Sequence, residues 1–401
     1  MPTRRTALLT AAAGALAVAA PVHSALGSEG GSSRKSPRRK GSRGVRLELT
    51  APGGRHPVGT VSAHLVDRAR RDPWMPDRPQ RELMVDVRYP ARAVHGHPRA
   101  AQMQPGAAAG FAELNNLADV PADRVDWAAT LTHAHEQAPV HAGTESLPVV
   151  LYSPGVMDPR TYGTTTADDL ASRGFLVVVV DHTYDASAVE FPGGRVERTC
   201  LLAEFEATGG DEERVRALLK KTLGVRVADL RFVLDALRSA LPPQLRRVAD
   251  FSRVGAYGQS AGGFAALQWM HDDRRVRAAA DLDGVLAFVQ EDAQPGHYAS
   301  VALDGVDRPF LLYGKDGHSP DTVPSWGELV RHSTGPHRSK ELRGAAHGSF
   351  TDSQVLIPQL ADALDLPGDV VKSLIGTVDP VASVAAQRTA LASLFNGSLA
   401  G

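Results

Sequence analysis

A serine set between two glycines, with an apolar strand before it and an apolar helix after it, constrains this chain more than any other feature. Gly258, Ser260 and Gly262 follow the apolar run 253–257 and open a segment with helical spacing of apolar side chains. In that context the Gly-x-Ser-x-Gly pattern is typical of a sharp strand-to-helix turn that presents a nucleophilic hydroxyl, and glycine avoids collisions with the neighbouring backbone. We therefore predict that Ser260 is a nucleophile; the alternative is a glycine-rich turn without chemistry.

After residue 45, short apolar runs alternate with helical patterns. The runs 148–152, 175–180 and 253–257 are largely apolar throughout, as expected for strands that helices cover on both sheet faces. Apolar spacing also predicts helices over 167–173 and 212–241. This order predicts an α/β fold with a mostly parallel central sheet. The predicted strands are 46–49, 58–66, 82–89, 148–152, 175–181, 253–257, 276–282, 309–313 and 340–342.

A nucleophilic serine needs a base within hydrogen-bond reach, and the base needs a carboxylate to orient it. In chains with this type of turn, the acid and then the histidine follow the serine. His347 lies in a loop of small residues after the last predicted strand, so we predict it as the base. Two acids are open: Asp283 ends the strand after the nucleophile helix, and Asp316 follows the next strand. The pattern alone slightly favours Asp316.

Composition limits the chemistry that the chain supports. The 401 residues are 43% hydrophobic and 22% charged, which suffices for a large core. Cys200 is the only cysteine, which excludes an internal disulfide and a cysteine-based zinc site. The net charge is −1, but residues 1–46 carry nine basic residues against one acidic residue, so the remainder carries −9. We expect no nucleic-acid partner, and no metal or organic cofactor is required.

The first 45 residues are predicted to serve export and tethering. Arg4 and Arg5 precede an apolar run, 7–20, that is shorter than a bilayer span of about 20 residues. We expect a signal peptide over 1–25, of the twin-arginine or the ordinary secretory type, and a flexible basic linker over 26–45. Residues 46–401 then form the folded domain. The protein is expected to be secreted or extracytoplasmic, without a stable membrane anchor.

Two segments, 99–146 and 187–226, fit the alternation poorly and are predicted to be insertions that cap a site. His133 and His135 of the first segment suggest a metal site, but they lack acidic partners and regular spacing. His182 follows a predicted strand at the sheet edge where ligands bind in such folds, so it is a candidate pocket residue. A plain surface histidine is the equal alternative for that position.

Five blocks of the sequence resemble the platelet-activating factor acetylhydrolase family of α/β-hydrolases. The resemblance covers residue 60 to the C-terminus and is weakest over the two predicted insertions. It implies the α/β-hydrolase fold. The blocks are the strand with a Tyr-Pro end at 81–90, the strand and turn at 149–155, the helix and strand start at 169–175, the serine turn at 258–263 and the histidine loop at 343–350.

The resemblance also implies roles for individual residues. It places the acid at Asp283, with Asp316 as the second candidate, and reverses the preference that the pattern alone gives. It implies that the backbone N–H groups of Val156 and Ala261 stabilise the oxyanion. Pro154 stands where the family commonly has histidine; proline lacks an N–H, but the implied donor is two residues later.

The implied function is hydrolysis of carboxylic esters through an acyl-enzyme intermediate, with short-acyl phospholipids or other lipid esters as expected substrates. The expected partner is thus a small-molecule or lipid ester. The alternatives are a general esterase, a polyesterase or a peptidase of the same fold, since the pocket decides among them, and a non-catalytic binding module. The sequence sets neither the preferred acyl length nor the oligomeric state.

Overall fold

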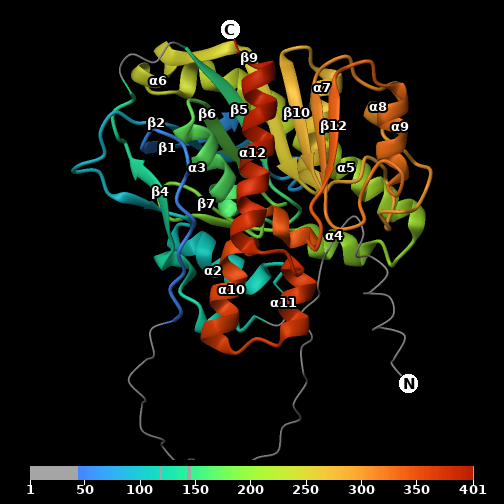
Figure 1. Ribbon diagram of the computed structural model, residues 1–401, viewed down its shortest axis with the longest axis horizontal. Coiled ribbons are helices and arrows are strands. Elements are labelled where there is room, and N and C mark those ends of the chain that lie inside the picture. Colours follow the sequence, from blue (N-terminus) through green and yellow to red (C-terminus); the bar gives the residue numbers. More distant parts are fainter. Residues whose placement is uncertain (1–43, 118–119, 142–145, 401) are drawn as a thin grey trace, which may run out of the picture.

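A computed structural model describes residues 44–117, 120–141 and 146–400 (Figure 1). Its centre is a sheet with the strand order β12-β11-β10-β9-β5-β6-β2-β1-β4-β3. The pairs β1–β2, β2–β6 and β3–β4 are antiparallel and the other pairs are parallel. The expectation of an α/β-hydrolase fold with a mostly parallel sheet is confirmed. The predicted signal peptide and all but the last two residues of the predicted linker lie outside the described residues.

Most predicted strands form close to their predicted positions, but segment 46–49 does not. In this region the chain makes only two isolated β-bridges, one from Glu48 to Leu131 and one from Val45 to Val125. Single bridges do not form a continuous ladder, so no strand results. The strands are β1 Val58–Asp67, β2 Arg81–Pro90, β3 Arg99–Ala101, β4 Leu131–Glu136, β5 Leu147–Ser153, β6 Leu176–Val180, β7 Ala188–Glu190, β8 Val196–Arg198, β9 Ala249–Gln259, β10 Val276–Leu282, β11 Phe310–Gly314 and β12 His337–Glu341.

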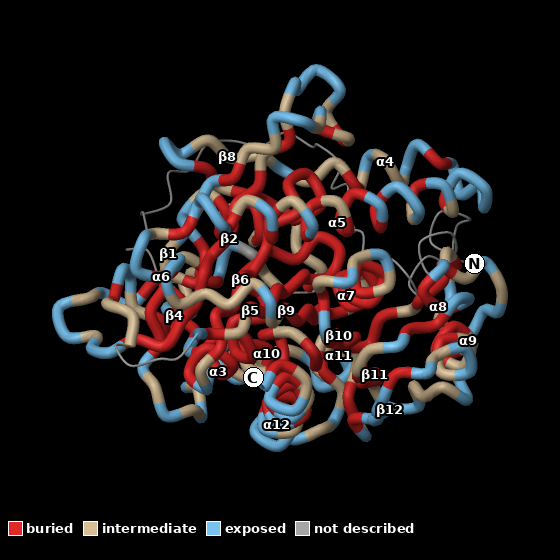
Figure 2. Tube along the Cα trace, turned by 90° about the horizontal axis from the view of Figure 1, so that it is seen from above, coloured by how far each residue is buried: buried red, intermediate tan, exposed pale blue. Residues whose placement is uncertain are grey.

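Helices cover both faces of the sheet, as apolar parallel strands require. Figure 2 shows α3 and α12 on one side of the sheet and α5 and α7 on the other. None of the helices in the described residues is long and apolar enough to cross a membrane. The helices are α2 Pro105–Leu114, α3 Thr164–Ser172, α4 Leu201–Ala207, α5 Glu212–Ala240, α6 Pro243–Val248, α7 Ala261–Asp272, α8 Ser300–Asp304, α9 Pro324–His332, α10 Ser353–Leu364, α11 Gly368–Ile375 and α12 Pro380–Ser398.

The two segments predicted as insertions are built into the fold in different ways. In 99–146, β4 pairs in parallel with β1 and β3 pairs with β4, so this segment extends the central sheet at its edge. In helix α2 of the same segment, Phe111 lines a cavity that also contains Ser260. Segment 187–226 forms the small β7–β8 sheet, α4 and the first half of α5.

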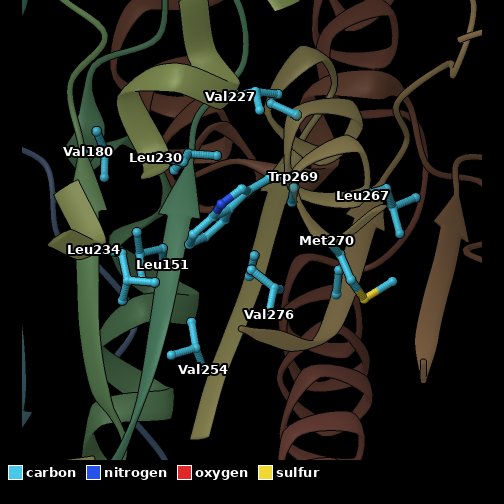
Figure 3. Packing of buried hydrophobic residues seen from close by; sticks show 14 of the residues in the cluster. Leu151, Val180, Val227, Leu230, Leu234, Val254, Leu267, Trp269, Met270 and Val276 are labelled. Atoms are coloured by element: carbon cyan, nitrogen blue, oxygen red, sulfur yellow. The ribbon is translucent and has the colours of Figure 1, made fainter. Parts of the chain in front are cut away.

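The larger core cluster lies between the sheet and the helices α5 and α7. Figure 3 shows the Trp269 indole of α7 pointing toward Leu151 of β5 and Leu230 of α5. All three side chains are at most 1% exposed. Because α7 begins at the residue after Ser260, this packing fixes the helix that carries the predicted nucleophile turn.

We predict that the buried side chains of α5 in this core contribute to the free energy of unfolding. Val233→Ala removes two buried methyl groups from a side chain that is fully buried, and should lower the free energy of unfolding by about 2 kcal/mol. The matched control is Val381→Ala in α12, where the valine is 76% exposed and the change should stay within ~0.5 kcal/mol. Urea unfolding of the two variants measures the difference, and equal losses would contradict this account of the core.

Candidate active site

The serine turn has the strained geometry that its sequence predicts. Ser260 joins β9 to α7 with φ 56° and ψ −127°, a conformation that side chains rarely adopt. A Cβ atom at Gly258 would lie 2.2 Å from the carbonyl carbon of Gly262, and one at Gly262 would lie 1.9 Å from the Ser153 oxygen. Both glycines are therefore required by close backbone approach, as predicted.

Asp283 and His347 meet beside this turn. Asp283 follows the last residue of β10 with a φ of 62°, and its carboxylate is buried. Its Oδ2 atom lies 2.6 Å from Nδ1 of His347, in the loop after β12. This bond places the ring proton on Nδ1 and leaves the Nε2 lone pair facing away from the acid, which is the tautomer that a general base needs.

The other oxygen of Asp283 is also held. Oδ1 accepts a hydrogen bond from the Lys315 backbone N–H at 2.9 Å, and Nδ1 of His318 lies 2.9 Å from it. Burial raises the pKa of Asp283, but the His318 and His347 rings and the Lys315 ammonium outweigh burial and hold the pKa well below its usual range. The carboxylate therefore stays ionised across the pH range in which an esterase works.

Asp316, the second candidate acid, does not reach the histidine. It is exposed, and its backbone N–H donates to the Ala345 oxygen at 3.3 Å. In the described part of the chain, no hydrogen bond or ion pair connects its carboxylate to His347. The geometry thus favours Asp283 over Asp316.

Gln259, which sequence reasoning missed, contacts the His347 ring on the side away from Asp283. Its Nε2 atom lies 2.9 Å from His347 Nε2, so the amide occupies the lone pair that would accept the serine proton. Among the described residues no hydrogen bond joins the Ser260 hydroxyl to His347, although both line one cavity. Catalytic hydrogen bonds often shorten only when substrate binds. A substrate at Ser260 would have to draw the ring from the amide toward the hydroxyl.

The loop after β5 carries Val156, the predicted partner of Ala261 in oxyanion stabilisation. Both residues line an apolar cavity together with Ser260. Ala261 is the first residue of α7, where helical N–H groups lack partners within the helix. Neither N–H is bonded to another of the residues that the structure describes. The two donors are thus available beside the serine.

A buried arginine holds this loop from behind, and its role was not foreseen. Arg226 of α5 donates to the Pro154 oxygen at 2.6 Å and to the Gly155 oxygen at 3.0 Å. It also makes a bidentate ion pair with Asp185, with both bonds at 2.7 Å. Asp185 in turn accepts from the Met157 N–H at 3.3 Å. Because the carbonyls of 154 and 155 and the amide of 157 are all held, the orientation of the Val156 peptide is fixed.

His182, the candidate pocket residue, is placed elsewhere. It is 1% exposed and lines neither cavity that contains Ser260. Its Nε2 lies 2.9 Å from the Ser153 hydroxyl and its Nδ1 lies 3.0 Å from Asp229, which is paired with Arg81. Burial lowers the pKa of His182, so the ring is neutral and supports the strand end below the loop. His182 does not line these cavities because its side chain turns inward, toward Ser153 and Asp229.

Two cavities flank Ser260. One, of about 140 Å³, also contains His347 and has mixed walls that include Phe111, Tyr162 and Asp158. The other, of about 40 Å³, lies against Val156 and Ala261 and does not include His347. Its other walls are mainly apolar side chains from α5, α7 and the segment after β10, namely Leu219, Leu223, Phe264, Val285 and Ala287, together with the polar Thr222 and Asp283.

Two histidines of segment 99–146 are engaged with backbone oxygens. His133 lies 2.8 Å from the Leu49 oxygen, and His135 lies 2.7 Å from the His97 oxygen. The described residues contain no group of three or more His, Cys, Asp or Glu side chains that could hold a metal ion.

Comparison with known proteins agrees with the fold and with the blocks quoted above. The family model described as "Platelet-activating factor acetylhydrolase, isoform II" matches residues 72–200. A probable 1-alkyl-2-acetylglycerophosphocholine esterase of Arthroderma benhamiae is 28% identical over 229 residues, which are 55% of this chain and 52% of that protein. The platelet-activating factor acetylhydrolase of Canis lupus familiaris is 29% identical over 248 residues, 55% of this chain and 51% of that protein. The matches span about half the length of these relatives.

The solved structure of a ferulic acid esterase from Streptomyces cinnamoneus matches more of the chain. It is 33% identical, with a TM-score of 0.69, and the match covers 88% of this chain and 93% of that one. Fold and site together define an α/β-hydrolase with a serine turn. Within that class, the chain belongs to the platelet-activating factor acetylhydrolase-like family. Ser260, Asp283 and His347 lie beyond the segment that the family model matches, so their roles rest on geometry.

The geometry predicts unequal effects for the two candidate acids. Asp283→Asn should reduce kcat for p-nitrophenyl acetate by about 10³–10⁴-fold, because an amide no longer fixes the ring tautomer or stabilises its positive charge. Asp316→Asn, in an exposed loop, should change kcat less than about twofold. Steady-state kinetics of the two variants tests this prediction. A larger loss of kcat in Asp316→Asn would assign the role of the acid to Asp316 instead.

Proposed function

We propose that this protein is a serine esterase that hydrolyses short-acyl carboxylic esters through an acyl-enzyme intermediate. The observation that carries the proposal is the 2.6 Å bond between Asp283 and His347, with the ring and Ser260 in the same cavity. An isolated serine is a weak nucleophile, and a base oriented in this way activates it. The binding-module alternative leaves this arrangement without a purpose.

In the proposed reaction, His347 takes the Ser260 proton as the hydroxyl oxygen attacks the ester carbonyl. Asp283 stabilises the resulting imidazolium, which then gives its proton to the leaving alcohol. Water, activated by the same ring, releases the acid and restores the serine. No step requires a metal or an organic cofactor.

The Val156 and Ala261 N–H groups are the proposed donors to the oxyanion. Loss of one such donor typically costs about 3–4 kcal/mol, or ~100 to 1,000-fold in rate. Arg226 and Asp185 support this function because they fix the peptide that carries the Val156 N–H. Preorganised dipoles stabilise a transition state without reorganisation at the moment of reaction.

The two cavities suggest where the halves of the ester bind. The leaving oxygen must lie within reach of His347, so the leaving alcohol occupies the cavity that this ring lines. The acyl chain then occupies the apolar cavity against Val156 and Ala261. Because that cavity has about 40 Å³, it favours a short acyl group such as acetyl.

Lipid esters are the substrates that the family relationship favours, because the relatives are named for acetyl esters of glycerophospholipids. A second candidate follows from the ferulic acid esterase, whose name indicates a large aromatic acyl group. Such an acyl group does not fit the apolar cavity and would have to bind beside Phe111 and Tyr162.

The nucleophile is tested by Ser260→Ala. We expect hydrolysis of p-nitrophenyl acetate to fall to the background rate, while circular dichroism and the unfolding temperature stay near those of the parent protein. Turnover that survives in this variant would remove Ser260 as the nucleophile. EDTA should leave the parent rate unchanged, and inhibition would reopen the question of a metal.

Acyl preference is tested with esters of graded size. We expect kcat/KM to fall by at least tenfold from p-nitrophenyl acetate to the octanoate, because the apolar cavity is small. Methyl ferulate, short-acyl phospholipids and tributyrin complete the panel. Preference for methyl ferulate would support the second candidate and contradict the acyl assignment.

A further inference from the structure

We propose that the cavity beside His347 recognises a positively charged leaving alcohol, whose ammonium group binds between the Asp158 carboxylate and the rings of Phe111 and Tyr162. The inference rests on the proposed function, because that function assigns this cavity to the leaving group. It adds a chemical class of substrate: esters of small amino alcohols, with the cation a few atoms from the ester oxygen.

Asp158 lies inside this cavity. It belongs to the loop that carries Val156, is 7% exposed, and lines the cavity together with Ser260 and His347. A Cβ atom at Gly155 would lie 2.9 Å from its Oδ2 atom, so the carboxylate faces the floor of the oxyanion loop. The carboxylate therefore lines the space that the proposed function assigns to the leaving group.

No cation in the described part of the chain forms an ion pair with Asp158. The Arg226 guanidinium approaches the same loop, but it pairs with Asp185 and binds two carbonyl oxygens. The described residues that line the cavity include no lysine or arginine. The Asn116 amide, which donates to the Val156 oxygen at 2.9 Å, also favours the charged form of the carboxyl, but it brings no charge of its own. An ionised carboxylate that is buried without a cation is unfavourable, and a bound cation removes that cost.

The aromatic walls suit the same kind of ligand. The Phe111 and Tyr162 rings both line the cavity, with their centroids 5.0 Å apart and their planes tilted by 51°. Tyr162 is fixed by a 2.8 Å hydrogen bond to the Ser353 hydroxyl, and Trp127 packs edge-on against Phe111. Aromatic rings attract alkylated ammonium groups through their electron-rich faces, most strongly where water is excluded. A carboxylate and two rings thus converge on one space.

The ionisation state of Asp158 should determine the pH range in which the cavity binds a cation. Burial, helped by the negative charge of Asp185, raises the pKa of Asp158 to about 7. The charges of His347 and Arg226 act in the opposite direction but do not outweigh burial. The carboxyl is therefore neutral at pH 5.5 and ionised at pH 8.5. Attraction for a cation should be present above this pKa and lost below it.

The test compares acetylcholine with 3,3-dimethylbutyl acetate, which has the same shape and lacks the charge. At pH 8.5 we expect kcat/KM for the charged ester to exceed that for the neutral ester by about tenfold or more. The ratio should approach one at pH 5.5. In Asp158→Asn it should be close to one at both pH values. Ser373→Ala, which alters the same cavity without changing its charge, should keep the parent ratio.

Binding without turnover gives an independent readout. Calorimetric titration of Ser260→Ala with tetramethylammonium chloride should show binding at pH 8.5, and Ser260→Ala/Asp158→Asn should show at least tenfold weaker binding. A ratio near one in the parent protein at pH 8.5, or equal binding by both variants, would overturn the proposal. If neither ester is hydrolysed, the proposed function fails instead, and the titration still decides whether the cavity binds a cation.

Discussion

The hydrogen bond between Asp283 and His347 is the interaction on which the proposed chemistry depends. It requires two loops, one after β10 and one after β12, to meet at the same edge of the sheet. Parallel pairing of β9, β10, β11 and β12 brings their carboxyl ends to that edge. The helices that cover the sheet therefore act on the site indirectly, because they hold the strands whose ends carry the serine and the acid.

A second layer of buried charge supports the opposite wall of the site. Arg226 and Asp185 are 1% exposed, and together they hold the loop that presents Val156. Removing one partner of such a pair strands a charge and typically costs about 3–5 kcal/mol. Asp158 lies in the same loop without such a partner, and this contrast is why we assign it to ligand recognition and Asp185 to structure.

Much of this arrangement could be predicted from the sequence. The serine turn is a local sequence signal, because Gly258 and Gly262 flank Ser260, although the backbone that they must approach includes the distant Ser153 oxygen as well as the turn itself. The apolar strands were equally clear, because burial on both sides leaves runs such as 176–180 without polar side chains. The choice between Asp283 and Asp316 needed the family resemblance, since both follow strands that end at the same edge.

Other features could not be predicted, because they depend on long-range contacts. Arg226 lies on a long helix whose pattern shows only amphipathic spacing, and its contacts are with carbonyl oxygens about seventy residues away. His182 follows a strand, as a pocket residue would, but the sequence does not show that its side chain turns inward to Ser153. The sequence of segment 99–146 likewise gives no signal that β4 pairs with β1.

The most direct test of the central claim is covalent trapping of the nucleophile. The protein should react with diethyl p-nitrophenyl phosphate to give a single diethylphosphoryl adduct, which peptide mass spectrometry should locate on Ser260. The rate of labelling should fall by about 10³-fold or more in His347→Ala, because the hydroxyl then has no base. Labelling of another residue, or an unchanged rate in that variant, would contradict the account.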